Sequence, residues 1–140
     1  MTTMMNTDIQ LELIYALGFY IDKYEVIRYE SSNELVFING KYLYYGKGSY
    51  VGPGYMIFSP IKSKIQIKSL FNYFLNKIYV ENGIYTSVYY SHKQGNCYQV
   101  VFKTESNTLY SDFYKNENLC YIDIIFRIGG CIINLSQYDI

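Results

Sequence analysis

The clearest pattern of hydrophobic and polar positions lies between residues 34 and 45. Two runs rich in β-branched and aromatic residues, Glu34–Ile38 and Lys41–Tyr45, flank the pair Asn39-Gly40. An Asn-Gly pair between two such runs is the strongest short-range hairpin signal, because both turn positions need a positive φ. The pattern therefore predicts a β-hairpin at this place.

Further strands are expected on both sides of this hairpin. Residues 19–30 are rich in aromatic and β-branched types, and residues 84–91 and 97–104 predict a second hairpin across Lys93–Asn96. Near the end of the chain, two strongly apolar runs, Leu119–Ile128 and Cys131–Leu135, are joined by Gly129-Gly130. We expect these two runs to form a buried hairpin near the centre of a sheet.

The segments between these runs have weaker patterns. Gly46–Gly54 contains four glycines and Pro53, which predicts a loop, and Tyr55–Phe58 is expected to form a short strand. Residues 61–68 alternate between apolar and polar types, so they form either a strand or the approach to a helix. Residues 105–118 are polar and are expected to form a long excursion, a type of segment that is often functional or mobile.

Two short helices are expected. Thr7 and Gln10 resemble a capping box before a helix from about Asp8 to Leu17, which Gly18 ends. Ser69 is the expected cap of a second helix, which Asn82-Gly83 ends. The apolar residues of this second helix share one face: Leu70, Phe71, Phe74, Leu75 and Ile78.

Together these elements predict an α+β fold in one domain, residues 1–140, with two short helices packed on tyrosine-rich antiparallel sheet. Segments separated by about 65 residues are similar, as in Leu35-Val36-Phe37 and Val100-Val101-Phe102. Two readings remain open. Residues 7–60 and 69–140 are duplicated helix-plus-meander halves, or two β-rich segments of a biased composition resemble each other by chance.

The composition narrows the classes of function. Of the 140 residues, 50% are hydrophobic and 17% are charged, which is typical of a packed domain, and the formal net charge is zero. A protein that binds duplex nucleic acid usually carries a basic excess, and a mimic of DNA carries an acidic one, so both classes are disfavoured. Zero net charge also removes the repulsion that keeps copies apart, which favours a homo-oligomer.

The aromatic content favours a protein partner. With 19 tyrosines and 8 phenylalanines, a domain of this size is not expected to bury every ring. Tyrosine, isoleucine, asparagine and lysine are abundant, Ala16 is the only alanine and tryptophan is absent, as AT-rich codons produce. The expected source is therefore a low-GC bacterium, a phage or a plasmid.

The cysteines and the apolar runs indicate a cytoplasmic protein. The odd set of Cys97, Cys120 and Cys131 contains no C-x-x-C pair and fits reduced thiols better than a disulfide framework. The first 21 residues lack the basic region of a signal peptide, and no window reaches 18 uninterrupted apolar residues. We therefore expect no membrane span.

The segment Lys41–Tyr55 is the best candidate for a binding site. Its lysines and aromatic residues alternate with flexible glycines, so they could stack bases, steady phosphates or contact a protein. The competing explanation is a glycine-rich loop that only joins two strands. The candidate binding residues are Lys41, Tyr42, Tyr44, Lys47, Tyr50 and Tyr55, and we expect Tyr44, Tyr50 and Tyr55 to be partly exposed in one patch.

Reactive groups are sparse. His92 and Cys97 flank the second hairpin turn, where a four-residue loop would place them nearly opposite each other as a base and a nucleophile. Nothing nearby supplies an orienting group or an oxyanion site, so no catalytic residue is assigned. A metal site would have to gather His92 with all three cysteines, and Cys120 and Cys131 lie in apolar runs typical of inert core thiols. We expect no metal and no cofactor.

Asp123 interrupts the apolar run Tyr121–Ile125 and has two interpretations. In a strand it is the outward residue, and Arg127, four positions along, shares its face without touching it. If Asp123 is buried instead, a perturbed pKa would make it a candidate site residue.

These observations favour a non-enzymatic protein-binding accessory or inhibitor protein that uses exposed tyrosines as anchors. Such a protein, encoded by a phage or mobile element, would act by occluding a host complex, for example a defence complex. One alternative is an enzyme that handles a small ligand or nucleotide in a groove between the halves, with His92, Asp112, Lys47 and Tyr50 converging there. A second alternative is a module that binds single-stranded nucleic acid.

Overall fold

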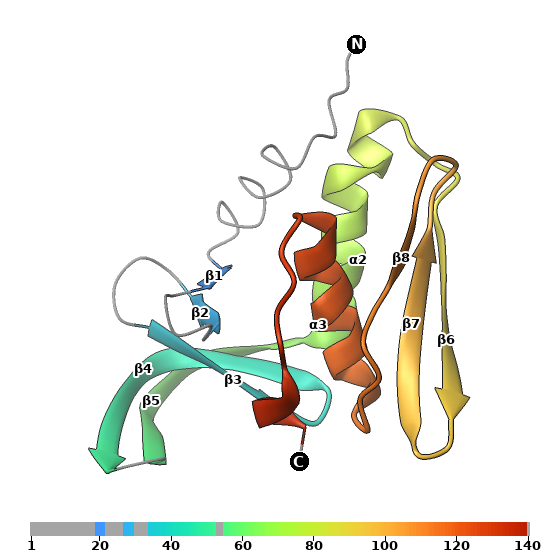
Figure 1. The fold of residues 1–140 in the computed structure, drawn as a ribbon. Helices are drawn as coiled ribbons and strands as arrows, with labels where there is room; N and C mark the ends of the chain where they lie inside the picture. The colour runs from blue at the N-terminus through green and yellow to red at the C-terminus, as the bar shows by residue number, and fades with distance from the viewer. Residues whose placement is uncertain (1–18, 22–26, 30–33, 53–54, 140) are drawn as a thin grey trace.

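The structure is a computed structural model, and it describes residues 19–21, 27–29, 34–52 and 55–139 (Figure 1). The strands are β1 (Phe19–Ile21), β2 (Ile27–Tyr29), β3 (Glu34–Asn39), β4 (Tyr42–Gly52), β5 (Tyr55–Gln66), β6 (Val88–Gln94), β7 (Cys97–Lys103) and β8 (Thr108–Tyr110). The helices are α2 (Ile67–Ile78) and α3 (Glu117–Ile128), with short 3₁₀ helices at Val80–Asn82 and Ser136–Tyr138. The helix expected over Asp8–Leu17 lies outside the described residues.

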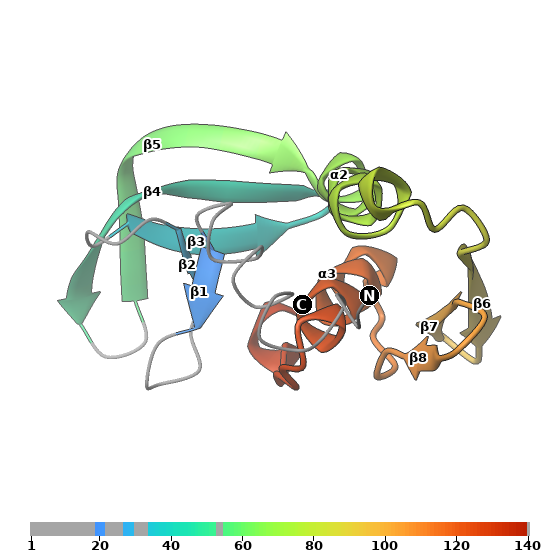
Figure 2. The ribbon, with the colours of Figure 1, turned by 90° about the horizontal axis from the view of Figure 1, so that it is seen from above.

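The predicted α+β architecture is confirmed. One antiparallel sheet has the order β1-β2-β3-β4-β5, and a second has the order β6-β7-β8. The helices α2 and α3 lie side by side between the two sheets, and α3 packs on β7 (Figure 2). At 12 residues each, α2 and α3 fall short of the roughly 20 residues that a helix needs to cross a bilayer.

The hairpin predicted at Asn39-Gly40 is confirmed. The turn lies one residue later than predicted: Asn39 is the last residue of β3 and pairs with Tyr42, so the two turn residues are Gly40 and Lys41. Gly40 has a φ of 57°, the left-handed conformation that a tight hairpin turn requires. Ile38 and Leu43 are both buried and belong to the hydrophobic core. The hairpin therefore supplies apolar side chains to the layer beneath it.

The loop predicted over Gly46–Gly54 is wrong. Strand β4 continues to Gly52, and β5 runs from Tyr55 to Gln66, so the segment is mostly a long, bent pair of strands (Figure 2). The register shifts beside Gly46, before Gly48 and before Gly52. Glycine inside a strand often marks such a bulge or bend, and here it permits curvature instead of ending the strand.

Helix α2 confirms the second predicted helix, although its ends differ. It begins at Ile67, and Ser69 is not its cap but lies in the first turn, where its Oγ donates to Gln66 Oε1 at 3.1 Å. The helix ends at Ile78, and the Asn82 side chain donates to the Ile78 carbonyl at 2.9 Å. The buried residues of α2 are Ile67, Leu70, Phe71, Phe74 and Ile78.

The second hairpin, β6 and β7, is also confirmed, with a shorter turn than expected. The turn is reduced to Gly95-Asn96, Gly95 has a φ of 65°, and Gln94 pairs with Cys97. His92 consequently pairs with Gln99. The expectation that His92 and Cys97 lie opposite each other is therefore wrong.

The buried hairpin predicted at the end of the chain is wrong, because Glu117–Ile128 forms helix α3. The helix lies between α2 and β7, so almost every side of it is covered. A helix buried all round has no polar stripe, and its apolar run cannot be distinguished from a buried strand by periodicity. Asn116 caps the helix by accepting a hydrogen bond from the Asn118 N–H at 3.1 Å.

The polar segment 105–118 is more ordered than the sequence suggests. It contains β8 and the first residues of α3, and Ser111 within it is only 2% exposed. The Asp139 carboxylate accepts hydrogen bonds from the N–H groups of Lys115 and Asn116, each at 3.0 Å. The chain after α3 therefore fixes the residues that lead into α3.

The turn of the first hairpin also contacts the start of α3. The Gly40 carbonyl accepts hydrogen bonds from Asn116 Nδ2 at 3.1 Å and from Asn118 Nδ2 at 3.4 Å. The Lys41 carbonyl accepts from the Ile67 N–H at 2.9 Å, at the start of α2. This turn thus joins the five-stranded sheet to both helices.

Candidate functional site

Three of the six candidate binding residues lie together at the start of β4. Lys41 is exposed, and its Nζ lies 5.7 Å from the ring centroid of Tyr42. The rings of Tyr42 and Tyr44 are half-buried, with centroids 6.2 Å apart and planes tilted by 53°. Both residues have further interactions, so this group forms part of the packed sheet surface.

The other three candidates lie in strands and not in a flexible loop. Lys47 and Tyr50 belong to β4, and Tyr55 begins β5. Tyr50 pairs with Met56, and Tyr55 pairs with Gly52. The side chains of these three residues lie outside the described part of the structure, so their expected exposure stays a prediction.

A different set of aromatic residues lies on the outer side of the three-stranded sheet. Tyr90, Val101 and Tyr110 form one row across β6, β7 and β8. Val101 is only 2% exposed although it does not belong to the main core, whereas Tyr90 is 47% and Tyr110 is 53% exposed. The two tyrosines therefore flank an apolar residue on the side of the sheet that faces away from the helices.

Two further apolar side chains extend this row. Val88, on the same side of β6 as Tyr90, is 57% exposed, and Phe113, just after β8, is 44% exposed. The Phe113 ring meets the His92 ring edge-on, with centroids 6.0 Å apart. We name Val88, Tyr90, Val101, Tyr110 and Phe113 the aromatic face.

The strands that carry the aromatic face contain no aspartate or glutamate. Of their two lysines, Lys103 shares the side of the face, whereas Lys93 lies on the other side, with its Nζ 5.5 Å from the ring centroid of Tyr98. Lys103 Nζ lies 5.6 Å from the ring centroid of Tyr90, a cation–π contact. His92 Nε2 lies 2.8 Å from Gln99 Oε1. The face is therefore apolar, with polar groups at its edge.

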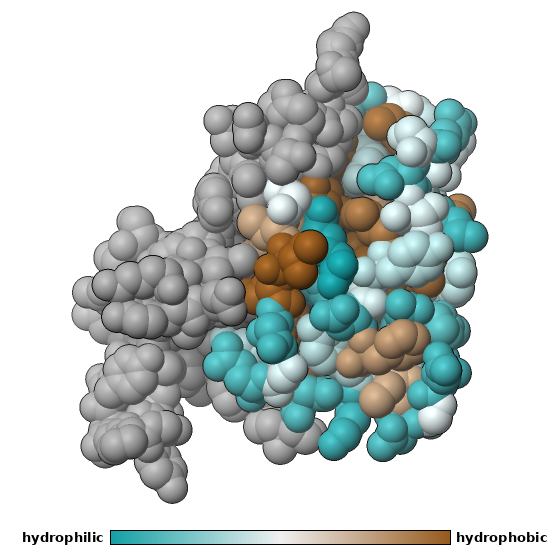
Figure 3. All heavy atoms as spheres, in the orientation of Figure 1, coloured by the Kyte–Doolittle hydropathy of each residue, from teal (hydrophilic) through white to brown (hydrophobic). Residues whose placement is uncertain are grey.

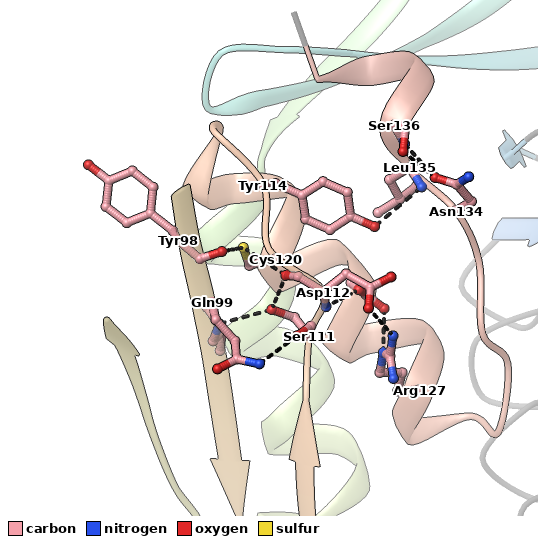
Figure 4. A network of polar contacts seen from close by, with 12 residues as sticks. Tyr98, Gln99, Ser111, Asp112, Tyr114, Cys120, Arg127, Asn134, Leu135 and Ser136 are labelled. Carbon is pink, nitrogen blue, oxygen red and sulfur yellow. Dashed lines mark hydrogen bonds and ion pairs between the residues drawn. The ribbon is translucent and has the colours of Figure 1, made fainter. Parts of the chain in front are cut away.

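Behind this sheet, a polar network fixes the segment that carries Phe113 (Figure 4). Asp123, on α3, is fully buried, and its Oδ1 accepts from Arg127 Nε at 2.6 Å while its Oδ2 accepts from the Asp112 N–H at 2.8 Å. Arg127 Nη2 also lies 3.3 Å from Asp112 Oδ1. A helix brings residues four apart into contact, so Asp123 and Arg127 form the direct ion pair that a strand would not allow.

Ser111 and Cys120 complete this network. Ser111 Oγ accepts from the Val100 N–H at 2.9 Å and donates to the Asp112 carbonyl at 2.8 Å. Cys120 Sγ donates to the Tyr98 carbonyl at 3.1 Å, and burial raises the pKa of this thiol to about 11. A thiol with such a pKa stays protonated near neutral pH, as expected for a core cysteine.

Asp123 is buried, as one interpretation of the sequence required, but its contacts indicate a structural role. Burial raises the pKa of its carboxyl, while the hydrogen bonds from Arg127 and the Asp112 N–H act in the opposite direction. Both carboxylate oxygens accept hydrogen bonds inside the protein, and the side chain has no exposed surface. The carboxylate therefore holds α3 to the chain after β8 and does not face a ligand.

The groups named for an enzyme have different partners where the structure describes them. His92 contacts Gln99, and Asp112 contacts Arg127. A hollow of about 260 Å³ lies beside the turn between β7 and β8, and it is lined by Tyr79, Ile84, Thr86, Thr104, Glu105, Ser106 and Asn107. Within the described ranges, no group of three or more histidine, cysteine, aspartate or glutamate residues could hold a metal ion.

The space-filling view shows a second apolar feature. A strongly hydrophobic spot lies on the visible side, over the segment that follows α3 (Figure 3). Ile132, in that segment, is 77% exposed. We assign no role to this spot.

In comparisons with models of protein families, with curated proteins and with solved structures, the chain matched none. The fold and the site are therefore interpreted from their own geometry.

The aromatic face was not predicted from the sequence, although one signal for it was present. Val88, Tyr90 and His92 alternate with Tyr89 and Ser91, but aromatic residues occur in both sets, so hydrophobicity does not identify the outer one. The Gly95-Asn96 turn does fix the register of β6 against β7, and that register places Tyr90 beside Val101. If the turn had been predicted to have two residues, the pairing of Tyr90 with Val101 would have followed from the sequence.

Proposed function

We propose that this protein is a non-enzymatic protein-binding module and that the aromatic face contacts its partner. The observation that carries the proposal is the row of Tyr90, Val101 and Tyr110, in which two half-exposed rings flank a buried valine. Tyrosine offers a large, rigid contact at a low cost in conformational entropy and is enriched at binding hot spots.

The surroundings of the face support this role. Interfaces commonly have an apolar centre and a polar rim. Here Val88 and Phe113 extend the centre, while Gln99, Lys103 and Thr108 supply polar groups at the edge. The sheet is held from behind by the Asp123 network, so the face is preorganised and little ordering is needed when a partner binds.

The biological role that we propose is that of an accessory or inhibitor protein that occupies a partner's surface. The AT-rich amino-acid usage is consistent with an origin in a phage or mobile element, and a defence complex of the host is the kind of partner that such a protein would occlude.

Affinity capture from the native host is the test, with the full chain and a Tyr90→Ser/Tyr110→Ser variant as matched baits. We expect the wild type to retain a specific protein and the double variant to retain at least about tenfold less of it, because aromatic anchors carry much of the binding energy. Mass spectrometry and quantitative immunoblotting measure the retained protein.

Tyr85→Ser is the matched control. Tyr85 is 73% exposed and lies in the connection before β6, and it is not one of the residues of the aromatic face. Its replacement is expected to leave capture unchanged. Equal retention by the wild type and the double variant would exclude the aromatic face as the binding surface.

Single-stranded nucleic acid is the second candidate, favoured by the aromatic rings and by the lack of acidic residues in β6, β7 and β8. Fluorescence anisotropy with labelled oligonucleotides distinguishes it. Binding that depends on Tyr90 and Tyr110 and weakens steeply with salt would replace the protein-binding proposal.

A further inference from the structure

Strand β6 has an open edge. It is the outermost strand of its sheet, and its seven residues pair with β7 in one continuous register, from Val88 with Lys103 to Gln94 with Cys97. Within the described part of the chain, no backbone group of β6 bonds to any element other than β7. An edge of this kind is a template for another strand.

The hydrogen bonds of β7 show which groups of β6 point outward. The N–H and C=O of Val100 both bond to Ser111, and those of Tyr98 both bond to Tyr114, so these residues face β8. Their partners in β6, Ser91 and Lys93, must then direct their own N–H and C=O away from β7, because antiparallel pairs alternate between bonded and non-bonded types. The same alternation points the groups of Tyr89 outward.

We propose that two copies of the chain form a homodimer in which β6 pairs antiparallel with β6 of the second copy, centred on Ser91. In this register Ser91 faces Ser91 of the second copy in a bonded pair, and Tyr89 faces Lys93. The outward N–H and C=O groups of all three residues then find partners. The two three-stranded sheets become one continuous sheet across the two-fold axis.

The side chains fit this register. Tyr90 lies opposite His92 of the second copy, Val88 lies opposite Gln94, and no two lysines face each other. A pairing centred on His92 or Lys93 would set each of those residues against itself and shorten the overlap. The formal net charge of zero means that no overall repulsion opposes the association.

Ser91 supplies a second, independent observation. Among the described residues, its Oγ is a buried side-chain oxygen that lacks a hydrogen-bond partner. Such an atom usually costs stability unless it is satisfied. At the two-fold axis the two Ser91 side chains are cross-strand neighbours on the same side of the sheet, and rotation about χ1 would turn each hydroxyl from its buried position toward the other.

The dimer is tested by sedimentation of the full chain at concentrations from about 5 to 500 µM, a range that spans weak and moderate association. We expect the wild type to be dimeric and Ser91→Pro to dimerise at least about tenfold more weakly. Proline removes the outward N–H of residue 91 but no bond to β7, and an edge strand tolerates it. A wild type that remains monomeric over this range overturns the proposal.

A charge-swap pair tests the register with replacements at exposed positions only. Tyr90→Lys/His92→Lys places lysine opposite lysine and is expected to be monomeric, whereas Tyr90→Glu/His92→Lys places glutamate opposite lysine and is expected to restore the dimer. Equal dimerisation of the two variants would contradict this register. Circular dichroism of each variant confirms that the fold is kept.

Amide hydrogen exchange gives a readout that needs no substitution. We expect the amides of Tyr89, Ser91 and Lys93 to become protected as the concentration rises, while those of Tyr90 and His92, which bond to β7, are protected throughout. If a dimer formed and these three amides still exchanged rapidly, the interface would lie on another surface and the proposal would be wrong. Tyr110→Ser is expected to weaken partner capture but not the dimer, which separates this proposal from the proposed function.

Discussion

Replacing Asp123 by alanine is expected to lower the free energy of unfolding by about 3 kcal/mol, since breaking a buried ion pair leaves an uncompensated charge. The change removes the 2.6 Å contact with Arg127 Nε and leaves the Asp112 N–H without an acceptor. Arg127 keeps its contact with Asp112, so the loss stays below that of a fully isolated charge. Urea unfolding followed by circular dichroism measures the change.

Asp112→Ala is the matched control for this experiment. The Asp112 side chain is 62% exposed, so its ion pair with Arg127 is screened by solvent and contributes at most about 1 kcal/mol. The Asp112 N–H, which Asp123 accepts, is retained in this variant. If Asp123→Ala were no more damaging than Asp112→Ala, the network in Figure 4 would not hold α3 to the segment after β8.

The protein is also expected to unfold in alkali between about pH 10 and pH 12, because several buried tyrosines must keep their protons in the folded state. Burial raises the pKa values of Tyr79, Tyr114 and Tyr121 from 10.0 to about 12. The stability that these groups contribute is fully present below pH 10, the unfolded value, and is lost as the pH rises through the folded value of about 12. The summed loss is several kcal/mol, comparable with the roughly 5–15 kcal/mol by which domains are stable.

Unfolding free energies at about pH 8 and pH 11 measure this loss, and tyrosinate absorbance reports the ionisation itself. Tyr79→Phe provides the control, because desolvation alone shifts the pKa of Tyr79 and no hydrogen bond of its hydroxyl is lost on replacement. We expect the unfolding free energy of this variant to match that of the wild type at about pH 8 and to exceed it by about 1.4 kcal/mol at about pH 11. Equal sensitivity of the two proteins to alkali would show that Tyr79 ionises freely.

The sequence predicts best the elements whose signals are local. Both hairpins follow from turn residues that accept a positive φ, Gly40 and Gly95, and α2 follows from an apolar stripe on one helical face. These signals are contained in a few neighbouring residues, so tertiary packing does not change them. The α+β class could therefore be predicted.

The predictions are wrong in segments whose secondary structure is determined by tertiary packing. The run Leu119–Ile128 is apolar on all sides because α2 and β7 cover it, and this burial removes the periodicity that would indicate a helix. Four glycines between residues 46 and 54 suggest a loop, but β5 pairs with β4 along this stretch, and the register shifts occur beside Gly46, Gly48 and Gly52. Which of these outcomes occurs depends on partners that are distant in sequence.

The sequence analysis named binding residues in Lys41–Tyr55 and did not predict the aromatic face. Outward tyrosines do occur, as the aromatic surplus suggested, but Tyr90 and Tyr110 come from different strands, and only the register of β7 brings them into one row. The contact between Asp123 and Arg127 likewise requires a helix. Because Leu119–Ile128 was interpreted as a strand, the contact between these two side chains could not be predicted.

The bonds between Gly40 and the start of α3 have a consequence for how the chain folds. The Gly40 carbonyl binds residues that are 76 and 78 positions away, whereas each hairpin closes over only a few residues. Hairpins form within roughly 1–10 µs, but a closure over so long a loop has a high entropic cost before it is stabilised. We therefore expect the rate-limiting step of folding to be the docking of preformed hairpins against α3, on the millisecond-to-second scale typical of proteins with distant contacts.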